Sequence, residues 1–400
     1  MESCTQMHKI EVSRIPLLIK NIIDCLIFLL GIASLCASAS NTVFFGGAGF
    51  ASNSEDIANA YPFSYRIYNS PEKELKLNSS IRSKISTIHN STFEIGLNLS
   101  ENNDSQVVFG FVVDREAISE EKIGDKYKLV IDISAQSLFF DYQSKAVLAS
   151  YPIAIQYIDI SQKPFSDSEK ASMVEKLYYG GLENNINILD EFSATLTKIK
   201  FSREVRQRVK VTNVNVDPEA LPILFPSLNE NSTKIFVAQQ FSKYLSNNQS
   251  IPVLPFTVGQ AIGGKMVTRL SGTEYSLVIP APDFAIELTL KPFKKIKFAE
   301  NNTGASWIYG SYLGVDVIEP DSQKSFLSAT LKYGATKSVP QSQTVVDDRA
   351  AYEEALLILI DNFTRTISSP DEAWAKRYAS DPAIANQMKK LNEVLKKCAM

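Results

Sequence analysis

The chain has 400 residues, of which 44% are hydrophobic and 21% charged, so it can bury the cores of about two globular domains. Its 41 lysines and arginines nearly balance its 44 aspartates and glutamates. The resulting formal net charge of −3 excludes the global positive field expected of a nucleic-acid-binding protein. With two histidines and four cysteines, the chain is poorly equipped for zinc binding or for catalysis by a serine or cysteine nucleophile.

The N-terminal segment has the pattern of a secretory signal. The apolar run CLIFLLGIASL (25–35) is shorter than the ~20 residues that a membrane span needs, and an A-x-A cleavage motif follows at 37–39. We therefore predict that residues 1–39 are a signal peptide, cleaved after Ala39. The alternative is an inner-membrane anchor over residues 15–39, which would place charged residues in its apolar core.

The number and position of the cysteines are compatible with an exported protein whose large core stabilises it without disulfides. Cys4, Cys25 and Cys36 fall within the predicted signal, so the exported chain keeps a single cysteine, Cys398, and has no internal disulfide. We predict that the protein is periplasmic or secreted, in a bacterium. Because Cys398 lies near the chain end, we expect an exposed sulfur that can form an intermolecular disulfide. His89 lies in a polar, turn-like stretch, and no metal or other cofactor is predicted.

The first predicted domain, residues 40–205, begins with strands and ends with two helices. Strands are expected where Val, Ile, Tyr and Phe are dense or alternate with polar residues, and these segments are 42–50, 61–69, 91–100, 105–114 and 127–160. The spacing then becomes helical. One helix is predicted between Ser166 or Asp167 as N-cap and Gly180 as C-cap, and a second over 186–199 from its apolar stripe.

The second predicted domain, residues 206–368, repeats this order of strands and helices. The predicted segments are a strand at 205–216, a helix at 232–245, strands at 250–256, 274–298, 307–320 and 324–334, and a long helix at 347–367. Residues 369–400 are predicted to form two short terminal helices, each opening on a serine with a proline close behind.

Similar segments in the two domains raise the hypothesis of an internal duplication. FDYQSKAVLASY (140–151) is similar to PDSQKSFLSATL (320–331), and LDEFSAT (189–195) is similar to IDNFTRT (360–366). The alternative is chance similarity between serine-rich amphipathic segments. The predicted fold class is α+β, with two sandwich units that each consist of a mostly antiparallel sheet and helices packed on it.

The order of motifs in the second domain resembles that of a known family. The helical FSKYLS (241–246) precedes IPVLPF (251–256), a D-S-Q-K turn lies at 321–324, and a long alanine-rich helix follows. This order resembles the α/β domains of envelope proteins of the curli-secretion-channel type and of outer-membrane lipoprotein activators. The resemblance implies a binding module without catalytic residues. The usual lipidated cysteine of these families is absent, which argues against outer-membrane anchoring.

Two lysine-rich segments are candidate contact surfaces for a partner, an anionic membrane surface or a glycan. They are LKPFKKIKF (290–298) and the C-terminal helix, and the candidate residues are Lys291, Lys294, Lys295, Lys297, Lys389 and Lys390. The alternatives are that the first group protects an edge strand from aggregation and that the C-terminal helix docks on its own domain.

Paired carboxylates occur in the long helix at Asp347/Asp348 and Glu353/Glu354, and we interpret them as solvated helix charges. We therefore predict an exported envelope protein that binds or assembles with another envelope protein, without catalytic activity and without a nucleic-acid partner. The alternative is a periplasmic hydrolase that uses paired carboxylates.

We predict that N-terminal sequencing of the exported protein begins at or near Ser40, because cleavage follows the A-x-A motif. Recovery of the full-length chain in the membrane fraction would show instead that residues 15–39 are retained as an anchor.

Overall fold

The computed structural model describes residues 41–51, 56–97, 106–203, 207–224, 230–256, 265–271, 273–343, 345–381 and 384–399. The predicted signal and the alternative anchor, with Cys4, Cys25 and Cys36, lie outside these residues. From Thr42 onward the chain forms one compact unit. None of the described helices combines the length and the apolar character that crossing a membrane requires.

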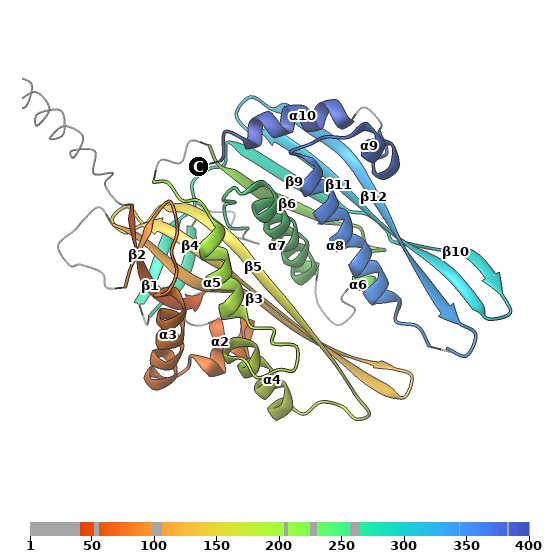
Figure 1. The fold of residues 1–400 in the computed structure, drawn as a ribbon, viewed down its shortest axis with the longest axis horizontal. Coiled ribbons are helices and arrows are strands. Elements are labelled where there is room, and N and C mark those ends of the chain that lie inside the picture. The colour runs from red at the N-terminus through yellow and green to blue at the C-terminus, as the bar shows by residue number, and fades with distance from the viewer. Residues whose placement is uncertain are drawn as a thin grey trace, which may run out of the picture. The chain divides into compact units, whose positions relative to one another are not determined.

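The first sheet is built by the first half of the chain together with one later hairpin (Figure 1). Its strands are β1 (Thr42–Phe50), β2 (Glu94–Gly96), β3 (Val107–Ile123), β4 (Lys126–Asp141), β5 (Val147–Ser161), β7 (Lys265–Leu270) and β8 (Thr273–Val278). β1 pairs in parallel with β2 and β3, and the remaining pairs are antiparallel, in the order β5-β4-β3-β1-β7-β8. By sequence the β7–β8 hairpin belongs to the predicted second domain, yet it extends the first sheet.

Helices cover one face of the first sheet through a core rich in phenylalanine. They are α2 (Ile57–Ala60), the 3-10 turn η1 (Ser64–Ile67), α3 (Pro71–Ile85), α4 (Asp167–Tyr179) and α5 (Ile188–Lys198). Phe111 of β3 meets Phe192 of α5 with ring centroids 5.2 Å apart. α4 begins with a capping box in which Ser166 and Glu169 each accept the other's backbone N–H, and it ends at the predicted glycine, Gly180.

One prediction before β3 is wrong, and one helix was not predicted. Residues 61–69, predicted as a strand, form turns and η1, and residues 71–85, for which no element was predicted, form α3. The helix begins where the Ser70 hydroxyl accepts the Lys73 N–H and Pro71 occupies the first turn. The buried face of α3 consists of only Leu77, Ile81 and Ile85. Because the rest of the segment is polar, its apolar periodicity was too weak to predict a helix.

The second sheet is built entirely by the second half of the chain. Its strands are β6 (Val209–Val216), β9 (Phe284–Leu290), β10 (Lys294–Asn301), β11 (Gly304–Glu319) and β12 (Lys324–Pro340). β6 pairs in parallel with β9. β9 and β10 pair antiparallel with successive parts of β11, and β12 pairs antiparallel with the other edge of β11 along its whole length. The predicted mixture of helices with mostly antiparallel sheets is confirmed.

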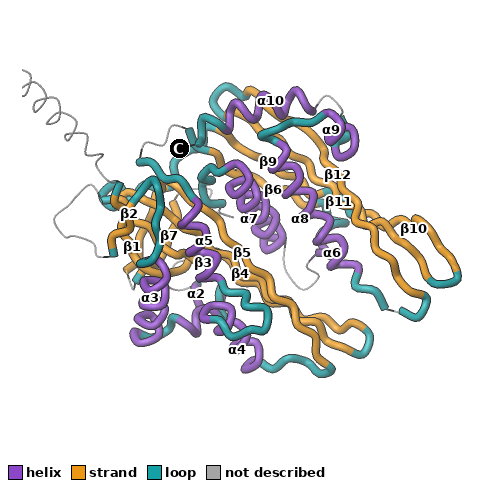
Figure 2. The backbone as a smooth tube through the Cα atoms, in the orientation of Figure 1, coloured by secondary structure: helices purple, strands orange, loops and turns teal. Residues whose placement is uncertain are grey.

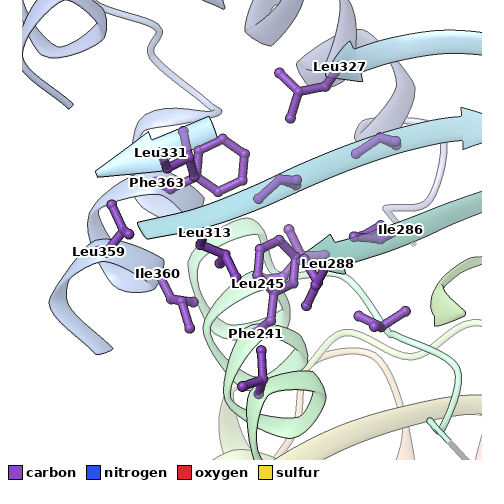
Figure 3. Packing of buried hydrophobic residues seen from close by; sticks show 14 of the residues in the cluster. Phe241, Leu245, Ile286, Leu288, Leu313, Leu327, Leu331, Leu359, Ile360 and Phe363 are labelled. Carbon is purple, nitrogen blue, oxygen red and sulfur yellow. The ribbon is translucent and has the colours of Figure 1, made fainter. Parts of the chain in front are cut away.

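The helices of the second half pack on one face of this sheet. They are α6 (Leu221–Leu224), α7 (Glu230–Gln249), α8 (Asp348–Thr366), α9 (Glu372–Tyr378) and α10 (Ile384–Leu395). Figure 3 shows the shared core, where Leu313 of β11 and Leu331 of β12 meet α7 and α8. The contributing helix residues include Phe241, Leu245, Leu359, Ile360 and Phe363, all nearly inaccessible to solvent.

The two halves repeat one topology, in which a strand and a helix are followed by a parallel strand, a long antiparallel hairpin and a closing helix (Figure 2). Thus β1-β3-β4-β5 corresponds to β6-β9-β11-β12. Each long hairpin also shifts register at the same place: Phe139 opposes Ala149 directly before the shift in the first, and Val317 opposes Leu327 in the second. This shared irregularity supports the duplication hypothesis.

The helices of the second half also contact the first sheet, on the face opposite α3, α4 and α5. Lys243 of α7 donates to the carbonyl oxygen of Ala154 in β5 over 2.9 Å, and Arg115 of β3 lies 5.2 Å from the ring centroid of Phe236 in α7. The layers are therefore helices, first sheet, α7 with α8, and second sheet. The described elements cover both faces of the first sheet but only one face of the second.

The prediction that Cys398 is exposed is wrong. The residue is 2% exposed and belongs to the core of the second half, because α10 docks on that core through Met388, Leu391 and Leu395. Its thiol lies 3.9 Å from the carbonyl oxygen of Val394. Burial raises the pKa of the Cys398 thiol to about 12, which keeps the thiol protonated at neutral pH. A packed, protonated thiol does not favour the predicted intermolecular disulfide.

We expect Cys398→Ser to destabilise the protein by about 1–3 kcal/mol, because it places a hydroxyl in an apolar site. The check is urea unfolding of the wild type and the variant, with Lys397→Ser as an exposed neighbouring control. Native protein should also react with Ellman's reagent at this site far more slowly than unfolded protein does. Fast labelling and an unchanged unfolding midpoint would contradict the buried position.

Candidate functional site

The predicted lysines of segment 290–298 lie on and beside the edge strand β10. All eight residues of β10 are exposed, and the strand pairs with β11 alone among the described strands. Lys295 forms an ion pair with Asp348 at 2.7 Å and lies 4.7 Å from the ring centroid of Trp307. Lys297 pairs with Glu300 at 3.0 Å. These two lysines are engaged within the fold, and they also protect an open strand edge.

Lys294 lines a groove on the outer face of the second sheet. The groove has a volume of about 300 Å³ and is formed by β10, β11, β12 and α9. Its lining residues are Lys294, Ile296, Ile308, Gly310, Tyr312, Lys332, Tyr333, Gly334, Arg377 and Tyr378. Lys291 is not among them, although its side chain lies nearby, beside Gly314 on the same face.

The floor of the groove is a cross-strand pair of glycines. Gly310 of β11 lies directly opposite Gly334 of β12. A Cβ on Gly334 would come within 2.7 Å of the Ile308 side chain, and a Cβ on Gly310 would come within 3.3 Å of the Tyr312 ring. Side chains at these two positions would fill the hollow, so the glycines keep it open.

Aromatic rings and cations form the walls of the groove. Tyr333 alternates with Lys332 and Gly334, so its side chain points to the inner face, and at the edge of β12 it stacks on Tyr378 with centroids 5.8 Å apart and an angle of 28° between the rings. Lys294 lies 5.5 Å from the centroid of Tyr312, and Arg377 lies 5.2 Å from that of Tyr378. The described lining includes no carboxylate. The groove can therefore attract an anionic group while its rings provide apolar contact area.

Lys389 and Lys390 do not belong to this groove. Both are exposed on α10, whose apolar face docks on the second half of the chain, as the alternative interpretation of that helix expected. The structure thus brings Lys294 together with Lys332 and Arg377, two residues that sequence reasoning missed. The missed signal was the alternation along 324–334, which becomes informative once β12 is placed beside β11.

A second polar site lies between the first sheet and α8. The interpretation of Glu353 as a solvated helix charge is wrong there. Glu353, predicted to be a solvated helix charge, is 7% exposed. Its Oε1 accepts a hydrogen bond of 2.5 Å from Gln156 Nε2, which also donates to Asp132 Oδ1 over 3.0 Å. Burial, and then the nearby charge of Asp132, raise the pKa of Glu353. Glu354, in contrast, is exposed as predicted.

Ion pairs surround this contact at the start of α8. Asp347 accepts from Lys128 of β4, and Arg349 donates to Glu121 and Ser119 of β3. Asp347 is therefore also part of the interface rather than a freely solvated charge, and it caps α8 as well. Two strands of the first sheet and the start of α8 supply these residues, so the charges join the two halves of the chain.

Asp114 is a third carboxylate of the same interface; the residue is half-buried, and its Oδ1 atom is shielded from solvent. Gln136 Nε2 donates to Asp114 Oδ2 over 3.2 Å, and burial raises the pKa of Asp114 to about 7 against the opposing effects of Gln239 and Arg115. The guanidinium of Arg115 in turn interacts with the charges of Asp132 and Glu353.

Beside Glu353 is a cavity of about 350 Å³, lined by β4, β5, α7 and α8. The predicted hydrolase would need two carboxylates facing each other across such a cleft. Here the amide of Gln156 bridges Asp132 and Glu353, and Arg349 and Lys128 stand near. The arrangement has the charge balance of a structural contact. His89 is exposed, as expected of a loop histidine, and no cluster of potential metal ligands occurs among the described residues.

Comparisons with known proteins leave the family open. No protein-family model and no curated protein matches the chain. One solved structure with local similarity is a Xanthomonas campestris protein of family DUF330, with 11% identity over 42% of this chain and 90% of that chain and a TM-score of 0.22. A minor lipoprotein from Acinetobacter baumannii has 13% identity over 44% of this chain and 98% of that chain, with a TM-score of 0.20. A Helicobacter pylori protein described as a putative neuraminyllactose-binding hemagglutinin homologue has 10% identity over 45% of this chain and 94% of that chain, with a TM-score of 0.23. At these TM-scores the similarities assign no function. None of the three is a curli-type channel, so that resemblance stays a prediction.

We predict that Asp114 makes the protein less stable as the pH rises through 7. The folded state raises the pKa of Asp114 to about 7 from an ordinary value of about 3.9, so its contribution to stability is complete below pH ~4 and is lost as the pH rises to ~7. Relative to wild type, Asp114→Asn should therefore gain stability between pH 5 and pH 8, measured as the difference in melting temperature. Glu354→Gln, at an exposed position of the neighbouring helix, is the control. A wild-type–variant difference that is constant with pH would contradict the shifted pKa.

Proposed function

We propose that this chain is a non-catalytic binding and assembly protein of a bacterial cell envelope, which holds an anionic partner protein in the groove of the second sheet. The observation that carries the proposal is the glycine-floored hollow with Lys294, Lys332 and Arg377 around it and no carboxylate in its described lining. Such a surface favours negatively charged partners by charge complementarity, while tyrosine rings supply contact area at small entropic cost.

The envelope location rests on the predicted signal and on a cysteine pattern that leaves one thiol after cleavage. The descriptions of the Acinetobacter lipoprotein and the Helicobacter hemagglutinin homologue agree with that location without adding a functional argument. The partner proposed here is another envelope protein. A membrane surface or a glycan, the other two partners considered from the sequence, is an outcome that the test below can return.

The competing proposal is a carboxylate hydrolase, and the observation in its favour is Glu353 beside the 350 Å³ cavity. Every contact of Glu353 described above also has a structural explanation, because Gln156 and Arg349 link α8 to the first sheet. The binding proposal therefore needs fewer assumptions. It predicts that Glu353→Gln changes stability without abolishing a partner complex.

We predict that a photo-reactive amino acid placed at Tyr312 crosslinks in intact cells to one defined protein. Lys332→Glu with Arg377→Glu should reduce that adduct by at least ~10-fold, which corresponds to about 1.4 kcal/mol of binding free energy. Lys389→Glu with Lys390→Glu changes the same number of charges outside the groove and should leave the adduct unchanged.

Two results would contradict this proposal. One is the absence of any adduct from position 312 in a protein that is folded and exported. The other is an adduct with lipid or polysaccharide in place of protein.

A further inference from the structure

The repeated topology allows the same sheet face to be compared in the two halves. When the register shifts of the two hairpins are aligned, Gly310 of β11 corresponds to Asp132 of β4, and Gly334 of β12 corresponds to Gln156 of β5. The flanking groove positions Ile308, Tyr312 and Lys332 correspond in the same way to Val130, Ser134 and Ala154. The groove therefore corresponds to the face of the first sheet that carries Asp132 and Gln156, and the contacts of that face within this chain can be described.

In the first half, that surface is where a helical layer docks. Gln156, which also donates to Asp132, donates a hydrogen bond to Glu353 of α8, and the carbonyl oxygen of Ala154 accepts a hydrogen bond from Lys243 of α7. Val130 lines the cavity beside α8. Asp132, Val130 and Ser134 are all at most 5% exposed as a result.

In the second half, none of the elements that the structure describes covers the same face. Ile308, Tyr312 and Lys332 are half-buried, and Gly334 is exposed. The inner-face positions agree between the halves, since Ile131 and Ile133 correspond to Tyr309 and Ser311, and all four are buried. The difference between the halves is thus confined to the outer face, as expected if the first has its helical partner within the chain and the second does not.

We propose that the groove receives an acidic amphipathic helix of the partner, docked as α8 docks on the first sheet. This inference rests on the proposed function and specifies the kind of partner. In the first half α8 presents the carboxylate of Glu353 to Gln156. A helix placed over Gly334 would present its carboxylate to Lys332, Lys294 and Arg377, and the glycine pair would let it approach the sheet closely.

The edge of β12 beside the groove argues against a partner that adds a strand there. Leu331 already forms an antiparallel bridge with Ala379, and Ser380 N donates to the carbonyl oxygen of Thr330 over 2.9 Å. The backbone edge at Thr330 and Leu331 is therefore already occupied, which leaves a partner strand less of β12 to pair with. A helix needs no free strand edge, because its own backbone groups are paired internally.

The test uses a synthetic fluorescent peptide with the sequence 347–366, which carries the α8 carboxylates, and the intact purified protein. We expect saturable binding measured by fluorescence anisotropy. Lys332→Glu in the protein should weaken it by at least tenfold, and Lys389→Glu should not weaken it. A matched peptide with Leu357→Pro keeps every charge but breaks the helix, and it should bind at least tenfold more weakly.

The outcomes separate the two proposals. Equal binding of the helical and the proline-containing peptide would overturn the helix inference and leave an anion-binding groove. Binding of neither peptide would also overturn it, while the cellular crosslink at Tyr312 decides independently whether the groove holds a protein. Binding that survives Lys332→Glu would place the peptide outside the groove and overturn the inference as well.

Discussion

The burial of charge between the first sheet and α8 is the constraint on which the arrangement of this protein depends. Glu353, Asp132 and Arg115 are removed from water together, and each would be costly to bury without the others. Gln156 links two of these groups through one amide. The free-energy cost of these buried charges rises steeply when any one of them loses its partner. The contact therefore fixes α8 at one position along the first sheet.

This constraint explains why α8 is not apolar all round, although it lies between two sheets. One side of the helix packs Leu356, Leu359 and Phe363 against the second sheet, and the other side presents Arg349 and Glu353 to the first. A helix with such a polar side has the sequence of a surface helix. Described helices therefore cover both faces of the first sheet but only the inner face of the second sheet. A surface for partners can accordingly form on the outer face of the second sheet.

The sequence predicted what local chemistry determines. Caps and apolar stripes located α4, α5 and α8. It failed where a residue's surroundings come from far along the chain: Gln156 and Glu353 are 197 positions apart, and nothing near Glu353 indicates its burial. The groove was missed for the same reason, because the Gly310–Gly334 pair exists only once the register of β11 and β12 is fixed. Cys398 was misjudged because α10 continues the core almost to the chain end.

On the duplication hypothesis, the positions at which the two halves agree or differ in sequence follow from the same physics. Sequence similarity occurs near the hairpin turns, in 140–151 and 320–331, although the register of the hairpins pairs 140–151 with 318–329, and it occurs again in the closing helices, which both pack on the inner face. It is lost at Asp132 against Gly310 and at Gln156 against Gly334, where identical backbone positions meet different surroundings. The Asp132–Gln156 pair meets the buried carboxylate of Glu353 from its own chain. The Gly310–Gly334 pair leaves space on the sheet for a partner. Divergence at these two positions, within an otherwise shared framework, is what separates an internal contact from an external one in this fold.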